Sequence, residues 1–568
     1  MKITLLFLTV CLSLSTFVLS AQADLIQNEE HTSQLTEVMA VQGDWKILKT
    51  EWTSSDEKHF SDFVAAIGKS GCKNINQCLK GPANPYRSSD SPSARFSSDC
   101  ADLPYVLRTY FAWKNGLPFG WVSSVEANPA VRADPSKPLD IRYSPNGNHV
   151  ASRASVITRA SATGEVKRAN GYRILSDVLN STSSAAFRVG AASESSSKPT
   201  DFYPIKLDRN SLHPGTAIYD PAGHVAVVYS VESDGRILFI DAHPDNSVTR
   251  GTYGKKFARS SPGHGAGFKN WRPMRLVGAS PAGNGEWTGG KVVPFSNSEL
   301  KDYSTVQFFG NEPDPKKAWN RGKFVIAGKA FDYYDYLRHV LSSGDLKYDP
   351  LNEYSLLLRG LCVDLKDRAT SVELAVTRGI HLKEHPARLP LNIYGSAGEW
   401  EDYATPSRDA RLKTSLKEAR DRSLEFIALW KAGDASVVYS GADLATDLRA
   451  VLEKESAACS FYYTKSDGKP SDPLSILDAS ARAFAMSFDP YHCPELRWGA
   501  TRSEELATCG DGEVKRRWYG ALGKLRNQIE RTYDARMDFT LPEMLDPARG
   551  GALGVETPPV VDLAESLH

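Results

Sequence analysis

The chain has 568 residues, and its 68 lysine and arginine residues balance 68 aspartate and glutamate residues, so its formal net charge at pH 7 is zero. Without a basic excess to neutralise phosphates, the composition argues against a protein that binds nucleic acid. A hydrophobic fraction of 41% is ordinary for a globular chain, and the length predicts two to four domains.

The first 23 residues have the pattern of a secretory signal peptide. Met1 and Lys2 precede an apolar run that ends near Leu19, and Ala21 and Ala23 follow in an A-x-A cleavage pattern. A membrane anchor is the alternative, but the run is short and contains Thr and Ser. We therefore expect cleavage after residue 23, a mature protein without an integral membrane segment, and a periplasmic or secreted location.

Seven cysteines remain after this cleavage, and exported proteins mature in compartments where thiols tend to pair. Local spacing, followed by elimination, predicts the pairs Cys72–Cys78, Cys493–Cys509 and Cys362–Cys459. Cys100 is then the odd cysteine, and a leftover thiol in an exported protein is a candidate reactive group.

The first strong element in the chain is a helix that follows Cys100. Apolar residues recur at helical spacing between Leu103 and Trp113, and a Gly and a Pro then end the pattern. Pro104 lacks an N–H and fits only in the first helical turn. The helix is therefore expected to begin near Asp102 or Leu103, with Cys100 on the turn before it.

Strands are predicted further along, after an insertion of short helices at about 122–210. Residues from His224 to Val231 are β-branched and apolar, a Ser-Asp-Gly turn follows, and residues 236–241 form the returning strand. These features close a first domain that we expect to span residues 24–285.

The remaining chain is predicted to be a mainly α-helical domain over residues 286–545. Apolar stripes at helical spacing run through 407–431, 443–454 and 513–531, and we interpret them as faces of the core. The tail, residues 546–568, is rich in Pro and Gly and is expected to be flexible. This half is the candidate for binding a protein partner.

Cys100 and His224 are the residues most suited to chemistry. A thiol near a helix N-terminus is favoured as thiolate, and unpaired N–H groups there can stabilise an oxyanion. His224 opens an apolar strand after a Gly turn, and either Asp241 or His243 at the end of the returning strand can reach its far ring nitrogen. This is the nucleophile, base and orienting group of covalent acyl transfer. The alternatives are a paired or buried cysteine and a surface histidine.

The segment His224-Val-Ala-Val-Val, the Ser-Asp-Gly turn and Asp241 seventeen positions after the histidine resemble the CHAP amidase and peptidase pattern. That family belongs with the NlpC/P60 enzymes in the papain-like group. The resemblance implies an α+β fold in which a helix packs on a small antiparallel sheet. It implies Cys100 as nucleophile, His224 as general base and acid, and Asp241 as orienting group, with His243 at the place of a further polar residue.

The resemblance also implies the substrate class, because this group mostly cleaves amide bonds in bacterial cell walls. We expect a peptide or peptidoglycan-type substrate and no cofactor or metal. The segment 381–385 fits the H-x-x-E-H zinc motif, but a Pro directly after it disfavours the helix which that motif needs.

Two other classes of function stay open. The residues next to Cys100 depart from the CHAP context, which favours a non-enzymatic envelope scaffold whose helical half binds a partner. A transglutaminase-like acyltransferase uses the same order of Cys, His and Asp.

Overall fold

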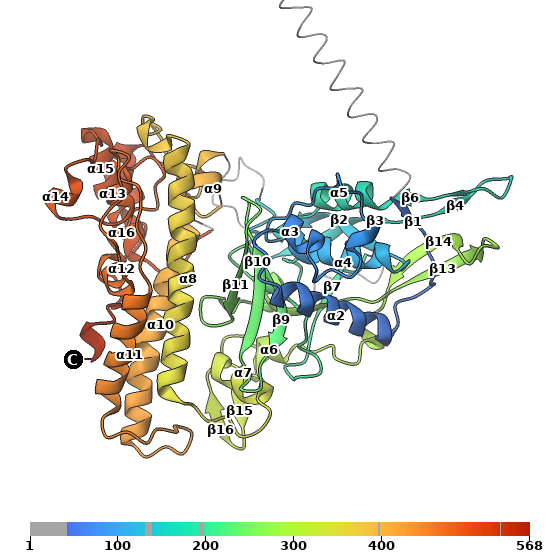
Figure 1. Cartoon of the computed structure of the whole chain (residues 1–568), viewed down its shortest axis with the longest axis horizontal. Coiled ribbons are helices and arrows are strands. Elements are labelled where there is room, and N and C mark those ends of the chain that lie inside the picture. Colours follow the sequence, from blue (N-terminus) through green and yellow to red (C-terminus); the bar gives the residue numbers. More distant parts are fainter. Residues whose placement is uncertain (1–42, 131–138, 192–197, 396–397, 534, 568) are drawn as a thin grey trace, which may run out of the picture.

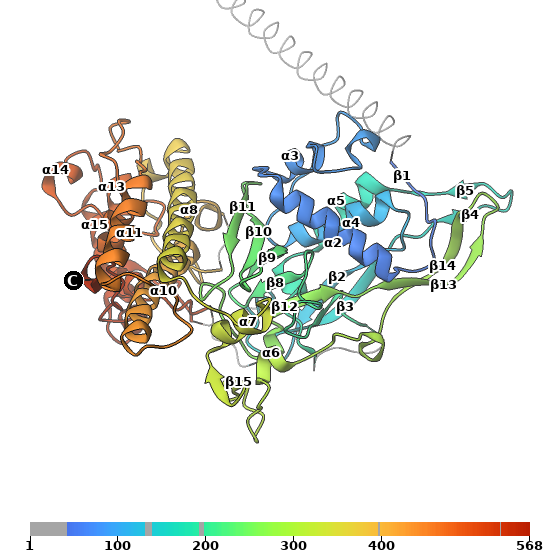
Figure 2. The same cartoon turned by 60° about the horizontal axis from the view of Figure 1, so that its bottom comes forward.

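A computed structural model of the chain describes residues 43–130, 139–191, 198–395, 398–533 and 535–567. The expected signal peptide lies outside these residues. The described chain has a first half of strands and helices and a second half of helices, so the fold class is α+β (Figure 1). Helix α8 (Pro350–Thr377) runs beside the edge strand β11 (Val248–Thr252), where the two halves meet (Figures 1 and 2).

Within the described ranges, no helix combines the length and the apolar character that crossing a membrane requires.

A six-stranded antiparallel sheet forms the centre of the first half, in the order β11-β10-β9-β8-β12-β7. Its other strands are β7 (Phe202–Pro204), β8 (Ala217–Asp220), β9 (His224–Val231), β10 (Ile237–Ala242) and β12 (Gly267–Trp271). The hairpin expected from the sequence is β9–β10, with Gly235 at a positive φ of 80° in its turn. Strand β7 lies in the range expected to be an insertion.

The two faces of the sheet are buried in different cores, as the alternation of side chains along a strand requires. Val225 and Val227 point into a core shared with the helices that precede the sheet, and Ala226 and Val228 point into a second core. The helices in the first core are α2 (Ser54–Lys69), α3 (Ile75–Lys80), α4 (Asp102–Lys114) and α5 (Gly171–Ser181). The second core is closed by α7 (Tyr333–Leu341). The sheet is thus covered on both faces.

Helix α4 begins and ends where the apolar pattern predicts. Its Arg108 is buried and pairs with Glu57 of α2 at 2.6 Å, because a buried guanidinium is costly without an anionic partner. Gly68 of α2 lies so close to Tyr229 of β9 that a Cβ there would overlap the ring. These contacts fix α2 and α4 against the sheet, and they hold Cys100 near the turn between β8 and β9.

Paired strands also flank the central sheet. They are β1 (Asp44–Trp45) with β6 (Ala169–Asn170), β2 (Gly120–Ala127) with β3 (Asn148–Ser155), β4 (Arg159–Ala160) with β5 (Val166–Lys167), β13 (Met274–Pro281) with β14 (Trp287–Pro294), and β15 (Phe324–Ile326) with β16 (Lys329–Phe331). The range 122–210, expected to contain short helices, is therefore largely β-ribbon with the helix α5. The domain boundary expected at 285/286 lies inside the β13–β14 hairpin, and the first half's core continues to Leu341.

The second half is helical from Pro350 onward. Asp349 caps α8 by accepting hydrogen bonds from the N–H groups of Leu351 and Asn352, with Pro350 at the first helical position. The other helices are α9 (Glu399–Tyr403), α10 (Pro406–Lys431), α11 (Leu444–Ala458), α12 (Ile476–Arg482), α13 (Pro494–Arg497), α14 (Ser503–Leu506), α15 (Glu513–Ala521), α16 (Gly523–Asn527) and α17 (Leu541–Leu545). A short helix, α6 (Val306–Phe309), belongs to the first half.

The end of the chain corrects one prediction. The tail was expected to be flexible, but Val561, Leu563 and Leu567 are buried in the same core as α8, α10 and α11. Three apolar side chains therefore anchor a segment that its Pro and Gly content alone would leave loose. The predicted helix at 513–531 is also interrupted, because α15 ends at Ala521 and α16 ends at Asn527.

The three disulfides expected from the sequence are present. Cys72 pairs with Cys78, Cys362 with Cys459 and Cys493 with Cys509, while Cys100 is unpaired. The second of these bonds joins α8 to the end of α11 across a sequence separation of 97 residues. Three disulfides fit a protein that matures in an oxidising compartment.

Candidate functional site

Cys100 lies on the turn directly before α4, beside the turn that joins the inner strands β8 and β9. The carboxylate of Asp99 accepts hydrogen bonds from the N–H groups of Ala101 and Asp102, both at 2.9 Å. These are the first N–H groups of the helix, so the expectation that they are open to an oxyanion is wrong. The N–H of Cys100 itself makes no hydrogen bond among the described residues, and it is the candidate oxyanion donor.

The Cys100 thiol is half-buried beside the start of β9. Its Sγ donates a long hydrogen bond, 4.0 Å, to the carbonyl oxygen of Gly223, the neighbour of His224. Burial, together with the charge of Asp99, raises the pKa of the thiol to about 12, although the Val225 N–H acts to lower it. In this structure the thiol is therefore protonated at neutral pH.

His224 and Asp241 are joined directly. Strands β9 and β10 pair Val227 with Ile240. Because side chains alternate between the two faces of a sheet, Asp241, which follows Ile240, lies on the same face as His224. The Nε2 atom of His224 lies 2.7 Å from Oδ2 of Asp241, and both side chains are buried. Burial lowers the pKa of His224, so the imidazole is neutral. Nδ1 makes no hydrogen bond within the described parts of the chain, and neither ring nitrogen is bonded to Cys100.

Asp241 is held by further partners. The hydroxyl of Thr249 in β11 donates to its other oxygen, Oδ1. Although burial alone would raise it, the pKa of Asp241 lies far below the usual range because of the charge of His243 and the hydrogen bonds from His224 and Thr249. Asp241 is therefore an ionised, fixed acceptor that sets the orientation of the His224 ring.

His243, the other residue proposed for this role, lies one layer further out. Its Nε2 is 3.1 Å from the Thr249 hydroxyl and 3.9 Å from Asp241 Oδ2, and its ring stacks on His224 with centroids 6.0 Å apart. Burial lowers the pKa of His243 to about 4. Of the two residues that could reach His224, Asp241 makes the contact and His243 supports it through Thr249, which carried no signal in the sequence.

The second half of the chain completes the surroundings of this group. His224, Asp241 and His243 line a cavity of about 40 Å³ whose other wall is formed by α8 and α10. The wall residues include Asp364 and Asp367 of α8 and Arg408 and Arg411 of α10. Apolar periodicity predicted only the core-facing stripe of α10, so these polar residues carried no signal for this position.

A second contact fixes the turn that carries His224. Arg531 pairs with the buried carboxylate of Asp220 at 3.0 Å, and the Tyr533 hydroxyl donates to the carbonyl of Ala222 at 2.6 Å. Tyr533 also stacks on Tyr143 with a centroid distance of 4.2 Å. The turn between β8 and β9 is therefore held by residues from near the end of the chain.

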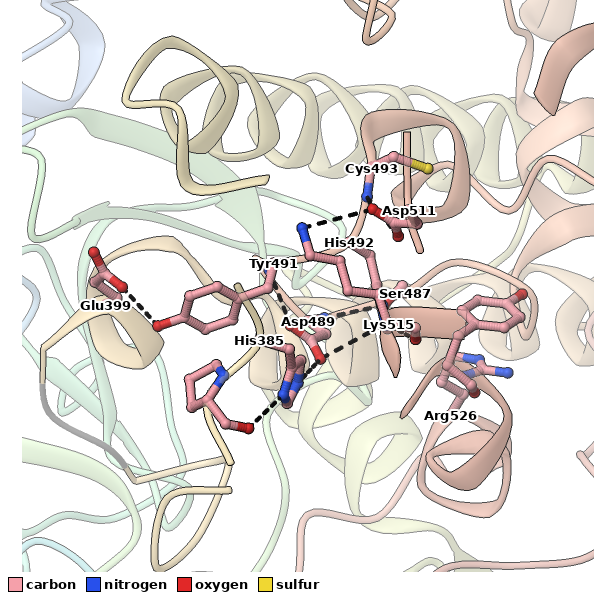
Figure 3. Close-up of polar contacts among 12 residues, drawn as sticks. His385, Glu399, Ser487, Asp489, Tyr491, His492, Cys493, Asp511, Lys515 and Arg526 are labelled. Carbon is pink, nitrogen blue, oxygen red and sulfur yellow. Dashed lines mark hydrogen bonds and ion pairs between the residues drawn. The ribbon is translucent and has the colours of Figure 1, made fainter. Parts of the chain in front are cut away.

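A second group of polar side chains lies inside the helical half (Figure 3). His385 Nε2 is 2.8 Å from Asp489 Oδ2, and Ser487 Oγ is 2.6 Å from Nδ1 of His492. The other ring nitrogens bond to the carbonyls of Pro386 and Lys515, at 2.7 and 3.0 Å. All of these side chains are buried and every ring nitrogen has a partner, so the group is a satisfied polar network of the core.

The same region includes one sequence motif and one cluster of side chains that could suggest a metal. The residues before His385 form a short 3-10 turn, Ile380–Leu382, so His381 and His385 do not share a helix face. Cys493, Cys509 and Asp511 bring three possible metal-ligand atoms within 4.8 Å of one another. Both sulfurs, however, are in a disulfide. A disulfide sulfur is not a thiolate, so this group cannot hold a metal in the oxidised protein.

A larger cavity of about 980 Å³ lies between β3 and β14, away from the candidate residues. Arg272 and Arg275 line it, but Arg272 bonds to Asn297 and to the Phe295 carbonyl, and Arg275 pairs with Glu299. The described residues that line it include no cysteine and no histidine.

Comparisons with protein-family models, with curated proteins and with solved structures found no match to this chain. Its function is therefore inferred from the chemistry of the site.

Proposed function

We propose that this protein is an exported cysteine hydrolase that cleaves amide bonds, with Cys100 as nucleophile, His224 as general base and acid, and Asp241 as orienting group. The observation that carries the proposal is the 2.7 Å bond between His224 and Asp241, beside the unpaired thiol at the start of α4. A helix that begins at the cysteine and packs on an antiparallel sheet bearing the histidine supports a papain-like first half.

The reaction follows from the protonation states. Because the thiol and imidazole are both neutral, the thiol proton passes to His224 as sulfur attacks the amide carbon. Asp241 stabilises the imidazolium, and the Cys100 N–H is placed to stabilise the oxyanion. The imidazolium then protonates the leaving amine, which leaves a thioester on Cys100. Water, deprotonated by His224, attacks the thioester and releases the acid and the thiol.

The proposed substrate is a peptide of the bacterial cell wall, and the proposed location is the periplasm or the medium. The three disulfides support an oxidising compartment, and the sequence resemblance supports the substrate class. An acceptor amine in place of water would make the same site an acyltransferase. Product analysis with added amine separates these two outcomes.

A scaffold without catalytic activity is the second candidate. It is favoured by the raised pKa of the thiol and by the lack of a hydrogen bond between Cys100 and either ring nitrogen of His224 among the described residues. Apo structures of active enzymes often show long catalytic contacts, so this geometry weighs less than the placement of the three groups together.

The test is alkylation of the native, unreduced protein with iodoacetamide, followed by peptide mapping. We expect Cys100 to be the modified cysteine, and His224→Gln to slow the modification because the base is lost. Cys100→Ser should no longer digest purified cell-wall peptides. Modification of Cys100 that requires denaturant would contradict the proposal and favour the scaffold.

A further inference from the structure

Two arginines of helix α10 lie in the wall of the cavity beside His224. Arg408 and Arg411 are three positions apart, so they lie on the same side of the helix, and both are half-buried. Arg408 donates one hydrogen bond, 3.2 Å, to the backbone carbonyl of Asp367. Arg411 makes no hydrogen bond and no ion pair with any described residue. A guanidinium has five donors and is ionised at all relevant pH values, so this is an unusual state for a half-buried arginine.

The other two arginines of α10, together with Lys417, show the contrast. Arg420 pairs with Asp421 at 2.8 Å, Lys417 also pairs with Asp421, and Arg422 lies 2.7 Å from Glu425 and 3.2 Å from Asp335. These side chains have carboxylate partners wherever they point. The two arginines that face the cavity are the ones that lack such a partner among the described residues.

The carboxylates of the cavity wall are largely used elsewhere. Asp241 accepts from His224 and Thr249, and Asp364 pairs with Lys256 at 3.1 Å and accepts from Ser415 at the same distance. Burial raises the pKa of Asp367 to about 7, against the charge of Arg408, so its carboxyl is only partly ionised at neutral pH. The remaining wall cation, Arg250, bonds to backbone carbonyls of α2 and the loop after it. Neither guanidinium group therefore makes an ion pair within the described residues, although the charges of Asp367, Asp245 and Asp241 favour the ionised form of Arg408.

The charge of these two arginines is close to the reacting groups. Arg411 acts to lower the pKa of Cys100, His224 and His243 alike, in each case as a smaller influence than burial. The cavity has about 40 Å³, which exceeds the ~10–15 Å³ that one water molecule needs. The cavity therefore has room for a small polar group such as a carboxylate.

We propose that Arg411, with Arg408 behind it, forms an anion-binding subsite of the active site, so that the preferred substrate carries a carboxylate next to the amide bond that is cleaved. Planar guanidinium groups bind carboxylates through paired hydrogen bonds, which gives both affinity and orientation. The helical half then contributes specificity-determining residues to chemistry located in the first half. This inference rests on the proposed function, because it assumes that Cys100 is the reacting thiol.

The test compares two alkylating reagents of nearly equal size, iodoacetate and iodoacetamide. With each, the Cys100 thiolate forms a bond to the reagent's CH₂ carbon while iodide leaves to the solvent. Iodoacetate carries a carboxylate and iodoacetamide does not, so the ratio of their rates at Cys100 reports binding of an anion near the sulfur. In Arg411→Gln we expect this ratio to fall about fivefold, and in Arg408→Gln by a smaller factor, with the effect weakened by added salt.

Matched controls separate charge from folding. Arg420→Gln removes the same charge from the same helix, about 180° away around its axis, and should leave the ratio unchanged. Arg411→Lys keeps the charge and should keep most of the ratio, even if Arg411→Gln loosens the fold. An unchanged ratio in both Arg411→Gln and Arg408→Gln would overturn the inference while leaving the proposed function intact. If neither reagent modifies native Cys100, the proposed function fails and the inference fails with it.

Discussion

Two histidine–aspartate pairs of nearly equal geometry lie in the two halves of this protein. His224 meets Asp241 at 2.7 Å in the first half, and His385 meets Asp489 at 2.8 Å in the second. Both pairs are buried and both use Nε2 and Oδ2. The distance between the partners therefore does not distinguish a candidate catalytic pair from a structural one.

Their surroundings do distinguish them. Around Asp489, both nitrogens of His385 and of His492 have partners, and the network is closed within the core (Figure 3). Beside Asp241, His224 keeps a nitrogen without a bond among the described residues, next to a cavity and an unpaired thiol. We therefore distinguish the candidate site by its hydrogen-bonding groups that have no partner among the described residues. Three comparisons of the two halves test this view.

The largest effects should come from removing the charge of each aspartate. We expect Asp241→Asn to lower kcat/KM for amide hydrolysis by about 10³-fold, because the ring of His224 loses the anion that orients it and stabilises its charged form. Asp489→Asn should instead lower the free energy of unfolding by about 2–3 kcal/mol, since a buried charge-assisted hydrogen bond is lost. Denaturant unfolding and steady-state kinetics measure the two effects. Equal loss of activity in folded Asp489→Asn would show that the pairs are not functionally distinct.

Acid should destabilise the second half. Burial lowers the pKa of His492, and His492 and His385 hold the pKa of Asp489 at about 2 although burial opposes this. In both cases the unfolded chain binds more protons than the folded chain, so stability falls as pH falls. The contribution of His492 is lost below about pH 6.5 and that of Asp489 between about 3.8 and 2.

We expect the loss in free energy of unfolding between pH 7.5 and pH 5 to be about 1–2 kcal/mol larger in the wild-type protein than in His492→Gln. Trp518, whose ring stacks on His385 at 4.5 Å, is a local fluorescent reporter for this half. The comparison with His492→Gln is needed because His224 and His243 act in the same direction in the first half, whereas the raised pKa of Asp367 acts in the opposite direction. An equal loss in the two proteins would contradict the assignment of a neutral, buried His492.

The smallest effects should come from the two hydroxyls that support the pairs. Thr249→Val frees one oxygen of Asp241, and we expect kcat/KM to fall about tenfold with little change in stability. Thr249→Ser should restore the rate, because it keeps the hydroxyl. Ser487→Ala leaves Nδ1 of buried His492 without its partner and should cost about 1–2 kcal/mol of stability with an unchanged rate. A slower reaction in Ser487→Ala, measured on the folded protein, would argue against this separation.

Local features of the sequence predicted the elements in the first half of the chain that carry the candidate site. The Gly turn, the β-branched run after His224 and the Asp-Gly turn define the β9–β10 hairpin, and Pro104 limits where α4 can begin. Spacing alone predicted the three disulfides and the odd Cys100. Each of these signals depends on residues close together in the chain, or on pairing by elimination.

Local sequence patterns could not predict contacts between segments that are far apart in the chain. Arg411 and Tyr533 reach the site because whole helices of the second half pack against the sheet, and periodicity within α10 assigns a face to the interior without saying what covers the other face. The buried tail shows the same limit, since Val561, Leu563 and Leu567 have no helical or strand period. The domain boundary was placed too early for a related reason, because β14 finds its partner in β13 across it.

The contact of Arg531 and Tyr533 with the turn before His224 has a consequence for biogenesis. Asp220 and its partner Arg531 are 311 positions apart, so the turn is secured only after nearly the whole chain has been synthesised. A nascent chain that already carries Cys100 and His224 still lacks this support and the α10 wall. The order of synthesis therefore delays assembly of the complete candidate site until translation is almost finished.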